Sequence, residues 1–537
     1  MTARLGAGLA LALLGLSVLG FGQSVVDPSD RLYRHLAIWD EKGYTSPLPS
    51  LRPYPIPVIA DALRTVAVRG APADVELAEL FARDLGEQAP TVQAAATLGV
   101  RGKADATGGD FGAVLRSQGA IGEQFSYSGA FRYWWDSTFG EEVSLRYRRR
   151  DVATFEGAGP HFDLGGESFR GLEDVRLLAA FALGPIAVQG GFSTVGFGSA
   201  LYESLVVADS APMASIAARV AGNQLSYEAM FFDLVALRAA RTTGETYSLK
   251  SELPPTGFPS KYLALHSLSW HPSPWLSLHG FQGTLFGGRF SLYALLPTAF
   301  ITEPFTGNRD NAFAGVSVEA TLPLEIGLRL DAFVDDYQFV DPVAGFNPSP
   351  FANKVAGTAA LSWAPAALML RASLDYTFVA PYMYTHSSHA ALNYLTYTHR
   401  GSSIGSALPP NSDRWQLELA AWPLAWLDLN AVTRYVRHGN GSDHGAGSVD
   451  GDGSIWDDGY TDAGSVTFYG GSTFLNQPVL EGTLQVELTV AAQLPIPQVR
   501  AAARAWYGIE HITNRGLDPA AEPELSHWLG IALEVGY

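Results

Sequence analysis

The chain of 537 residues contains no cysteine, and no long hydrophobic run follows its first 22 residues. Without cysteine the chain has no disulfide and no thiolate site, and we expect no lipid-anchored amino terminus. A membrane-spanning helix needs about 20 consecutive apolar residues, so none is expected in the mature chain. Any membrane crossing must therefore be made by strands.

Basic residues are scarce relative to acidic ones. Lys and Arg total 35 against 53 Asp and Glu, which gives a formal net charge of -18. Nucleic acid is not an expected partner, because binding it requires a basic patch that displaces counterions. Anionic lipid headgroups are also repelled on average.

Residues 1–22 are typical of a secretory signal peptide. Arg4 precedes an apolar run over residues 5–19, and the small residues Gly20 and Gly22 follow where cleavage is expected. The run is too short for a retained membrane span. We therefore expect an exported protein whose mature chain begins at residue 23.

Residues 23–90 predict short helices. A capping segment at 27–30 is followed by apolar side chains at helical spacing. A proline-rich crossing over 47–57 leads to two further helical patterns at 58–68 and 72–85. We expect a small periplasmic helical section.

The hydrophobic period changes from 3.6 to 2 near residue 91 and stays at 2 over residues 91–537. Arg329 and Asp331, for example, alternate with Leu328 and Leu330. Soluble sandwiches and membrane barrels share this alternation. Roughly eighteen segments of about 9 to 13 residues favour a barrel, since soluble strands are usually half as long. The predicted fold is all-β, a transmembrane antiparallel barrel of about 18 strands.

The connections between these segments alternate between short and long, as in bacterial outer-membrane barrels with periplasmic turns and outer loops. The last strand ends on Tyr537, an aromatic carboxyl-terminal residue suited to pairing with the first strand and to engaging the barrel-assembly machinery. Short connections lie at 183–185, 222–223, 271–274, 323, 364–365, 423–424 and 494–497; long ones lie near 237–260, 287–310, 337–352, 379–411, 438–479 and 509–525.

The loop over residues 438–479 is the most acidic part of the chain. Asp450, Asp452 and Ser454 have the alternate oxygen spacing that calcium uses, although the glycine and closing glutamate of an EF-hand are not in register. A solvated glycine-rich loop explains the same residues. Beside them Trp456 offers a flat face for a sugar ring, and with Asp457 and Asp458 it forms a candidate glycan site. No other cofactor is expected.

A second polar cluster lies at residues 385–389, which include His386 and His389, and Asp335 ends a strand that points outward. A rim hydrolase would use such groups, because a histidine near neutral pH activates water or a hydroxyl. The spacing matches no catalytic motif. The neighbouring tyrosines favour a membrane-boundary girdle instead: Tyr382, Tyr384, Tyr394 and Tyr397. We expect no enzyme.

Charged residues also fall on the polar face of the predicted strands. They either line a water-filled channel or pair with one another across a plugged interior. The set comprises Arg329, Asp331, Glu418, Glu481 and Glu487.

Several stretches together resemble the Wzi-type capsule-assembly family of outer-membrane barrels. One departure is Val195-Gly196-Phe197-Gly198-Ser199, where the family tends to have Trp-Gly-Pro-Gly. The resemblance implies an eighteen-stranded barrel with a periplasmic helical section, acting as a surface lectin that attaches capsular polysaccharide. The matching stretches are 30–63 with its prolines, Lys261-Tyr262-Leu263-Ala264-Leu265-His266, Asp310-Asn311, Asp335-Asp336, Pro381-Tyr382-Met383-Tyr384-Thr385-His386 and residues 405–413.

The sequence therefore predicts an outer-membrane barrel of a diderm bacterium whose partners are surface polysaccharide and outer-membrane lipid. Its expected role is non-catalytic binding or organisation of capsular polysaccharide through the long outer loops. The alternative is a porin or solute channel, which requires an open lumen.

Overall fold

The computed structural model describes most of the chain between residues 27 and 536. The described residues are 27, 30–85, 91–103, 106–122, 124–137, 155–164, 167–208, 211–236, 260–288, 292–297, 310–337, 353–386, 395–400, 402–439, 455, 474–496 and 499–536.

Eighteen antiparallel strands of the described chain close into a barrel, which confirms the predicted fold. β23 pairs with β2, from Gly536 opposite Ala95 to Trp528 opposite Lys103, and so closes the cylinder. The strands are β2 Thr91–Lys103, β3 Ala106–Ile121, β4 Phe125–Asp136, β6 Glu167–Leu183, β7 Ile186–Ser193, β9 Met213–Ala221, β10 Leu225–Val235, β11 Ser260–Ser273, β12 Leu276–Gly287, β13 Asn311–Leu322, β14 Ile326–Tyr337, β15 Asn353–Trp363, β16 Leu370–Val379, β19 Ser412–Leu424, β20 Leu427–His438, β21 Glu481–Ile496, β22 Val499–Thr513 and β23 Glu524–Gly536.

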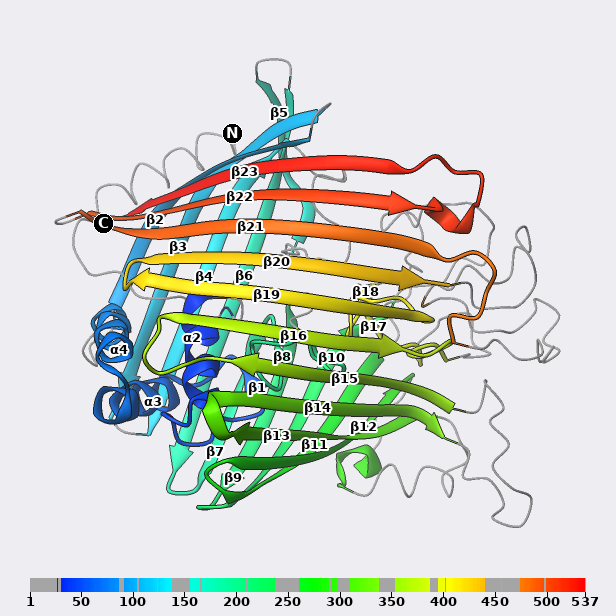
Figure 1. Ribbon diagram of the computed structural model, residues 1–537. Coiled ribbons are helices and arrows are strands. Elements are labelled where there is room, and N and C mark those ends of the chain that lie inside the picture. The colour runs from blue at the N-terminus through cyan, green and yellow to red at the C-terminus, as the bar shows by residue number, and fades with distance from the viewer. Residues whose placement is uncertain are drawn as a thin grey trace, which may run out of the picture.

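One further strand, β5 (Phe155–Leu164), pairs with Glu167–Glu173 of β6, while β4 pairs directly with Arg170–Phe181 of the same strand. In Figure 1 the β5 hairpin projects beyond the wall of the barrel. β5 therefore extends the wall at β6 without being one of the strands that close the barrel, and the number of closing strands stays even.

The two ends of the barrel differ in their connections, and we call them the turn end and the loop end. Short connections such as 184–185, 222–224 and 425–426 join the strands at the turn end. Longer connections join most of them at the loop end, on the right in Figure 1. In bacterial barrels the short-turn end faces the periplasm.

The predicted alternation gives the wall an apolar outside and a polar inside. Leu330 is 44% exposed on the outside, whereas its neighbour Arg329 is buried inside. An apolar outer belt of this kind needs lipid around it. Aromatic side chains stand near its edges, with Trp363 and Trp426 at the turn end and Trp415 at the loop end. No helix among the described residues is long and apolar enough to cross a membrane.

The first helix, α2 (Arg31–Glu41), lies inside the barrel (Figure 1). The Asp30 side chain caps its start by accepting a hydrogen bond from the Leu32 N–H at 3.0 Å. Its other end is followed by Gly43, whose positive φ of 71° turns the chain back. The buried apolar face of the helix includes Leu36 and Trp39.

Helices α3 (Ile56–Arg69) and α4 (Pro72–Leu85) pack on each other at the turn end of the barrel (Figure 1). Both have proline in the first turn, where a missing N–H costs nothing. Between α2 and α3, the short strand β1 (Leu51–Arg52) pairs with β8 (Gly196–Phe197) inside the lumen.

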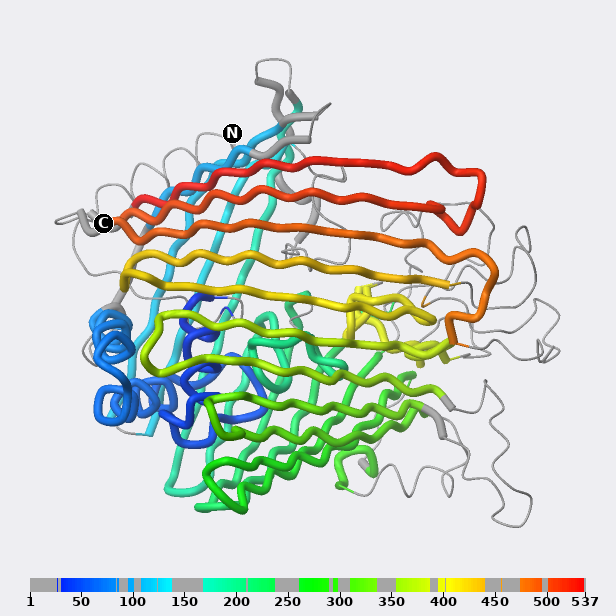
Figure 2. Tube along the Cα trace, in the orientation of Figure 1, coloured from blue at the N-terminus to red at the C-terminus, as the bar shows by residue number. Residues whose placement is uncertain are grey.

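Two long connections fold into the lumen and form what we call the plug, residues 194–208, 380–386, 395–400 and 402–411. It includes β8, β17 (Thr398–His399) and β18 (Ser402–Ser403). The plug packs into one apolar cluster with the inner wall of β9 to β16. Figure 2 follows these traces inside the barrel.

Aromatic rings form the centre of the contact between plug and wall. Phe313 and Phe333 of the wall stack with ring centroids 5.0 Å apart, and Tyr397 of the plug meets Phe313 edge-on at 5.3 Å. The wall makes room for its rings with glycines directly opposite them, as at Gly315 opposite Phe281. A Cβ on Gly315 would come within 2.2 Å of the Phe281 ring.

Candidate functional site

Ion pairs to the inner wall hold the carboxyl-terminal end of α2. The Arg371 guanidinium donates to the Glu41 carboxylate at 2.8 Å and to the Tyr202 hydroxyl at 2.6 Å. Ser362 also donates to Glu41, and the Arg371 side chain is fully buried. Glu41 thus links α2 to β15, β16 and the plug.

The amino-terminal end of α2 is held in the same way by β19 and β20. Arg34 donates to Glu418 at 2.6 Å, and Arg31 pairs with Asp428. His35 faces Asp428 as well, and burial lowers the pKa of His35 to about 4, so this ring is neutral at physiological pH. The helix is therefore fixed at both ends by wall residues distant in sequence.

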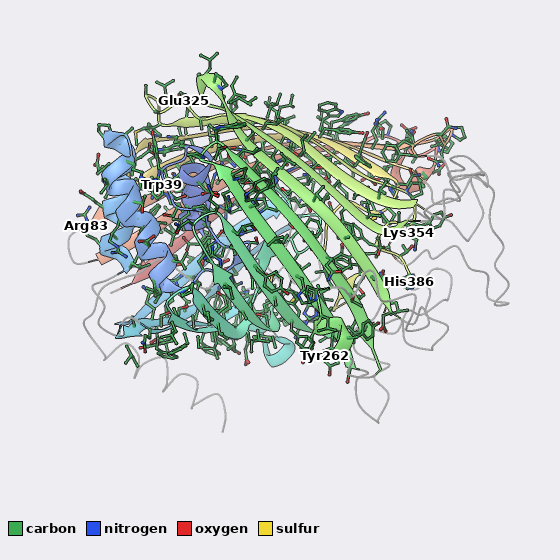
Figure 3. The ribbon with its side chains drawn as sticks, turned by 90° about the horizontal axis from the view of Figure 1, so that it is seen from below. Trp39, Arg83, Tyr262, Glu325, Lys354 and His386 are labelled. Atoms are coloured by element: carbon green, nitrogen blue, oxygen red, sulfur yellow. The ribbon has the colours of Figure 1, made fainter. Side chains whose placement is uncertain are left out.

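Buried cations hold the plug to the wall. Arg414 of β19 donates to Glu203 of the plug at 2.5 Å. Lys261 of β11 donates to the Thr396 carbonyl at 2.7 Å, and Lys354 of β15 donates to the Thr385 carbonyl at 2.8 Å. In Figure 3, Lys354 and His386 lie towards the loop end, whereas Glu325 projects at the opposite end.

Tyrosine hydroxyls join the two parts of the plug. Tyr384 donates to the Leu205 carbonyl and Tyr397 to the Val206 carbonyl, each at 2.8 Å. Burial raises the pKa of Tyr397 well above its ordinary value. The predicted girdle is therefore wrong for Tyr382, which is 2% exposed, and for Tyr384 and Tyr397, which are fully buried. These rings fill the lumen because their loop folds inward; Tyr394 lies outside the described residues.

The lumen-facing charges predicted from the sequence are paired. Arg329 bonds Asp331 at 2.7 Å and also pairs with Glu319. Glu487 pairs with Arg434 at 3.4 Å, and Glu418 pairs with Arg34 and Arg371. Glu481 accepts from the Gly516 N–H at 2.8 Å.

Two cavities flank α2 at the turn end of the lumen. The turn-end cavity, about 480 Å³, lies between the end of α2 with residues 43–50 and the wall of β12 to β14. The charged cavity, about 400 Å³, lies between the start of α2 and the wall of β2 to β4, β6 and β20 to β23. Its lining includes Arg31, Arg116, Arg132, Arg176 and Arg504 together with Asp27, Asp30, Asp110, Asp174, Asp428 and Glu534.

The loop residues predicted as a glycan and calcium site lie outside the described residues: Trp456, Asp457, Asp458, Asp450, Asp452 and Ser454. Tyr537 and His389 lie outside them too. Ile455, from the same loop, is described and packs against the cluster that contains the plug. Within the described chain, no group of three or more His, Asp or Glu side chains is placed to hold a metal ion.

Within the predicted rim cluster, the backbone of His386 and the carboxylate of Asp335 accept hydrogen bonds from the second connection of the plug. The His386 carbonyl accepts from the Thr396 hydroxyl at 3.1 Å, and the Asp335 carboxylate accepts from the Tyr384 N–H at 3.2 Å. Glu41, Arg371 and Glu203 were not predicted from the sequence as lumen contacts. The available signal was a basic residue, Arg371, on a lumen face that it shares with the small, polar, buried side chains of Ser373, Asp375 and Thr377.

No family model and no curated protein matches the chain. Among solved structures, the chain is similar to Escherichia coli Wzi, described as an outer membrane protein involved in group 1 capsule assembly and a carbohydrate-binding β-barrel. The TM-score is 0.56 at 14% identity, over 96% of this chain and 99% of that one.

Two Pseudomonas aeruginosa proteins match less well. OccD3 (OpdP) has a TM-score of 0.42 at 12% identity, over 84% of this chain and 91% of that one. OpdK, solved with vanillate, has a TM-score of 0.42 at 11% identity, over 83% of this chain and 99% of that one. Likeness at these identities concerns the fold. The protein is an outer-membrane β-barrel with a Wzi-like fold.

Proposed function

We propose that the protein binds or organises surface polysaccharide, capsular polysaccharide in the first place, as a non-catalytic, lectin-like barrel. The observation that carries this proposal is the plug. Two connections leave the wall and fill the lumen beside β9 to β16, held by Arg414, Lys261 and Lys354. Such packing suits a rigid platform for the outer loops better than a wide passage.

The fold comparison supports the same proposal, because the similar Wzi barrel is described as carbohydrate binding and matches along almost the whole chain. The long outer loops are the expected contact surface. Trp456, Asp457 and Asp458 would grip single sugars weakly, and many repeats on one polymer would raise the avidity. A calcium ion held by Asp450, Asp452 and Ser454 would bridge an acidic loop to an anionic polymer.

Deletion of the gene tests the proposal when cell-attached and released polysaccharide are quantified separately. We expect loss of attached polymer with continued secretion, and full restoration by the wild-type gene. Trp456→Ala should restore less attachment, whereas Trp426→Ala, at the turn end, should restore all of it. Unchanged attachment in the deletion strain contradicts the proposal.

A solute channel is the second candidate, and the charged cavity favours it. Small side chains line part of this cavity, including Ala491, Ala502 and Ala532, and charged groups of both signs face it. A passage between α2 and this wall would conduct ions. A steady ion current through the purified protein in planar bilayers, together with unchanged polymer attachment in the deletion strain, would favour a channel over a polysaccharide-binding protein.

A further inference from the structure

The turn-end cavity has the dimensions and the access of a binding site. Its volume of about 480 Å³ is in the range of small-ligand pockets. The turn residues Asn223, Gln224 and Trp275 line it, so that its mouth is at the periplasmic end. The first part of the plug also lines the cavity, through Phe197, Gly198, Ser199, Leu201 and Tyr202, whereas the longer connections leave the strands at the other end of the barrel (Figure 1). The cavity is therefore separate from the loops considered for surface polysaccharide.

Two neighbouring strands place hydrogen-bonding side chains on the inner wall of this cavity. His279 on β12 is directly opposite Ser317 on β13, and both line the cavity. The His279 Nδ1 is 2.8 Å from the Ser269 hydroxyl, which orients the ring. Within the described chain the His279 Nε2, the Ser317 hydroxyl and the Ser273 hydroxyl have no hydrogen-bonding partner.

These unpaired atoms indicate a hydroxyl-rich occupant. Ser317 is only 7% exposed, and a buried hydroxyl without a partner is costly unless water or a ligand bonds it. A serine hydroxyl donates and accepts, and so does a neutral imidazole through its two nitrogens. Sugar hydroxyl groups are complementary to such a wall because each one also donates and accepts.

The buried charges around the cavity compensate one another within the protein, while Arg69, which also lines it, is exposed to solvent. Glu319 pairs with Arg329, and Glu41 pairs with Arg371 at 2.8 Å. Asp40 accepts from the Thr45 hydroxyl at 2.7 Å, and burial raises the pKa of Asp40 to about 7. A charged ligand would have to compete with these pairs, whereas a neutral ligand would not.

An aromatic side chain completes the site. Trp275 lines the mouth of the cavity and is 56% exposed. An indole face left in contact with water can pack on the apolar face of a sugar ring. We propose that the turn-end cavity is a periplasmic binding site for a neutral saccharide, with Ser317 and His279 as hydrogen-bonding residues and Trp275 as the stacking residue.

Binding can be measured on the full chain purified in lauryldimethylamine oxide, a detergent without a sugar headgroup. The probes are cellotriose, maltotriose and chitotriose, with trigalacturonate as the charged comparison. Tryptophan fluorescence and saturation-transfer NMR report binding. We expect at least one neutral trisaccharide to bind saturably and more tightly than trigalacturonate.

Single substitutions then localise the binding. Ser317→Ala should raise the Kd about five-fold, as expected for loss of one hydrogen bond. Trp275→Ala should abolish the fluorescence change and weaken the NMR signal. Ser267→Ala is the matched control, because Ser267 is another buried β-strand serine whose hydroxyl has no hydrogen-bonding partner among the described residues, but it does not line the cavity. Its Kd should be unchanged.

Three results would overturn the proposal: no saturable binding of any neutral trisaccharide, tighter binding of trigalacturonate, or equal effects of Ser317→Ala and Ser267→Ala. Circular dichroism of each variant shows whether the barrel is intact. If Trp275→Ala disturbs it, Trp275→Phe keeps an aromatic face, and binding should persist. The substitutions at Ser317 and Trp275 leave the outer loops unchanged, so their failure to alter binding leaves the surface-polysaccharide proposal untouched, and the reverse also holds.

Discussion

Replacing Arg371 by methionine should release α2 from the barrel wall. Arg371 is fully buried and donates to Glu41 at 2.8 Å and 3.3 Å and to Tyr202 at 2.6 Å. Removing one partner of a buried ion pair typically costs about 3 to 5 kcal/mol, because the other charge stays buried. Glu41 keeps the hydrogen bond from Ser362, and Glu418 keeps Arg34 at 2.6 Å. The lower end, about 3 kcal/mol, is therefore the expected cost.

Hydrogen exchange measured by mass spectrometry on residues 31–41 reports this loss. A cost of about 3 kcal/mol corresponds to exchange about 100-fold faster or more, since each 1.4 kcal/mol is about a factor of ten. Arg515→Met is the control, because Arg515 and Glu524 form an exposed pair at the loop end, where such pairs contribute less than about 1 kcal/mol. In the Arg515→Met variant, the hydrogen exchange of α2 should be as slow as in the wild-type protein.

A double substitution tests the physical reason. Adding Glu41→Gln to Arg371→Met removes the uncompensated carboxylate, so protection of α2 should recover in part. The coupling between the two sites is expected to be about 1 to 3 kcal/mol. Unchanged exchange in Arg371→Met, or additive losses in the double variant, would refute the assignment of this pair as the anchor of α2.

Three further predictions concern the wall, the plug and the orientation. Gly315→Ala should lower the stability of the barrel by about 1 to 3 kcal/mol, measured by urea unfolding, because its Cβ would displace the opposite ring; an unchanged midpoint would contradict this packing. Burial lowers the pKa of His399 to about 4, and its Nδ1 accepts from the Val235 N–H at 3.0 Å. The stability it contributes is present above about pH 6.5 and is lost as pH falls towards 4, so His399→Gln should flatten the fall in melting temperature over that interval. The chain has no native cysteine, so a single introduced cysteine can be labelled selectively. Asn223→Cys, at the turn end, should react with an impermeant maleimide only after the outer membrane is permeabilised, whereas Ala520→Cys, at the loop end, should react in intact cells. The opposite result would show that the turn end faces outward.

The wall of the barrel could be predicted because its physics is local. A period of two and a length near that of a tilted span describe each strand by itself, as for Arg329 between Leu328 and Leu330. The alternation of short and long connections then predicted which end of the barrel faces the periplasm. The closing pair, β2 with β23, follows once the wall is a cylinder, since a barrel has no edge strand.

The contents of the lumen could not be predicted in this way. Tyr384 and Tyr397 belong to a loop whose direction depends on contacts with residues 205 and 206, which are 179 and 191 positions away. Aromatic residues in a polar loop look the same whether they face a membrane boundary or a lumen. The partners of Glu41 are distant too, since Arg371 lies on β16. Ion pairs of this kind become visible only when the wall is closed around α2.

The Wzi-like resemblance was confirmed at the level of the fold, by a match over 96% of the chain at 14% identity. The motifs that carried it lie at structurally constrained places. Lys261 and the segment 381–386 are contacts between plug and wall, and residues 405–411 continue the plug. These residues are therefore explained by packing inside the lumen, whereas the proposed binding of polysaccharide depends on Trp456 and its neighbours.

Planar-bilayer recording of the purified full chain tests most directly whether this barrel is a polysaccharide platform or a passage. With α2 and the plug in place, the protein should insert without steady conductance steps, and Arg371→Met should produce them more often. Steady, voltage-independent steps from the wild-type protein would contradict the account and favour a channel along the charged cavity.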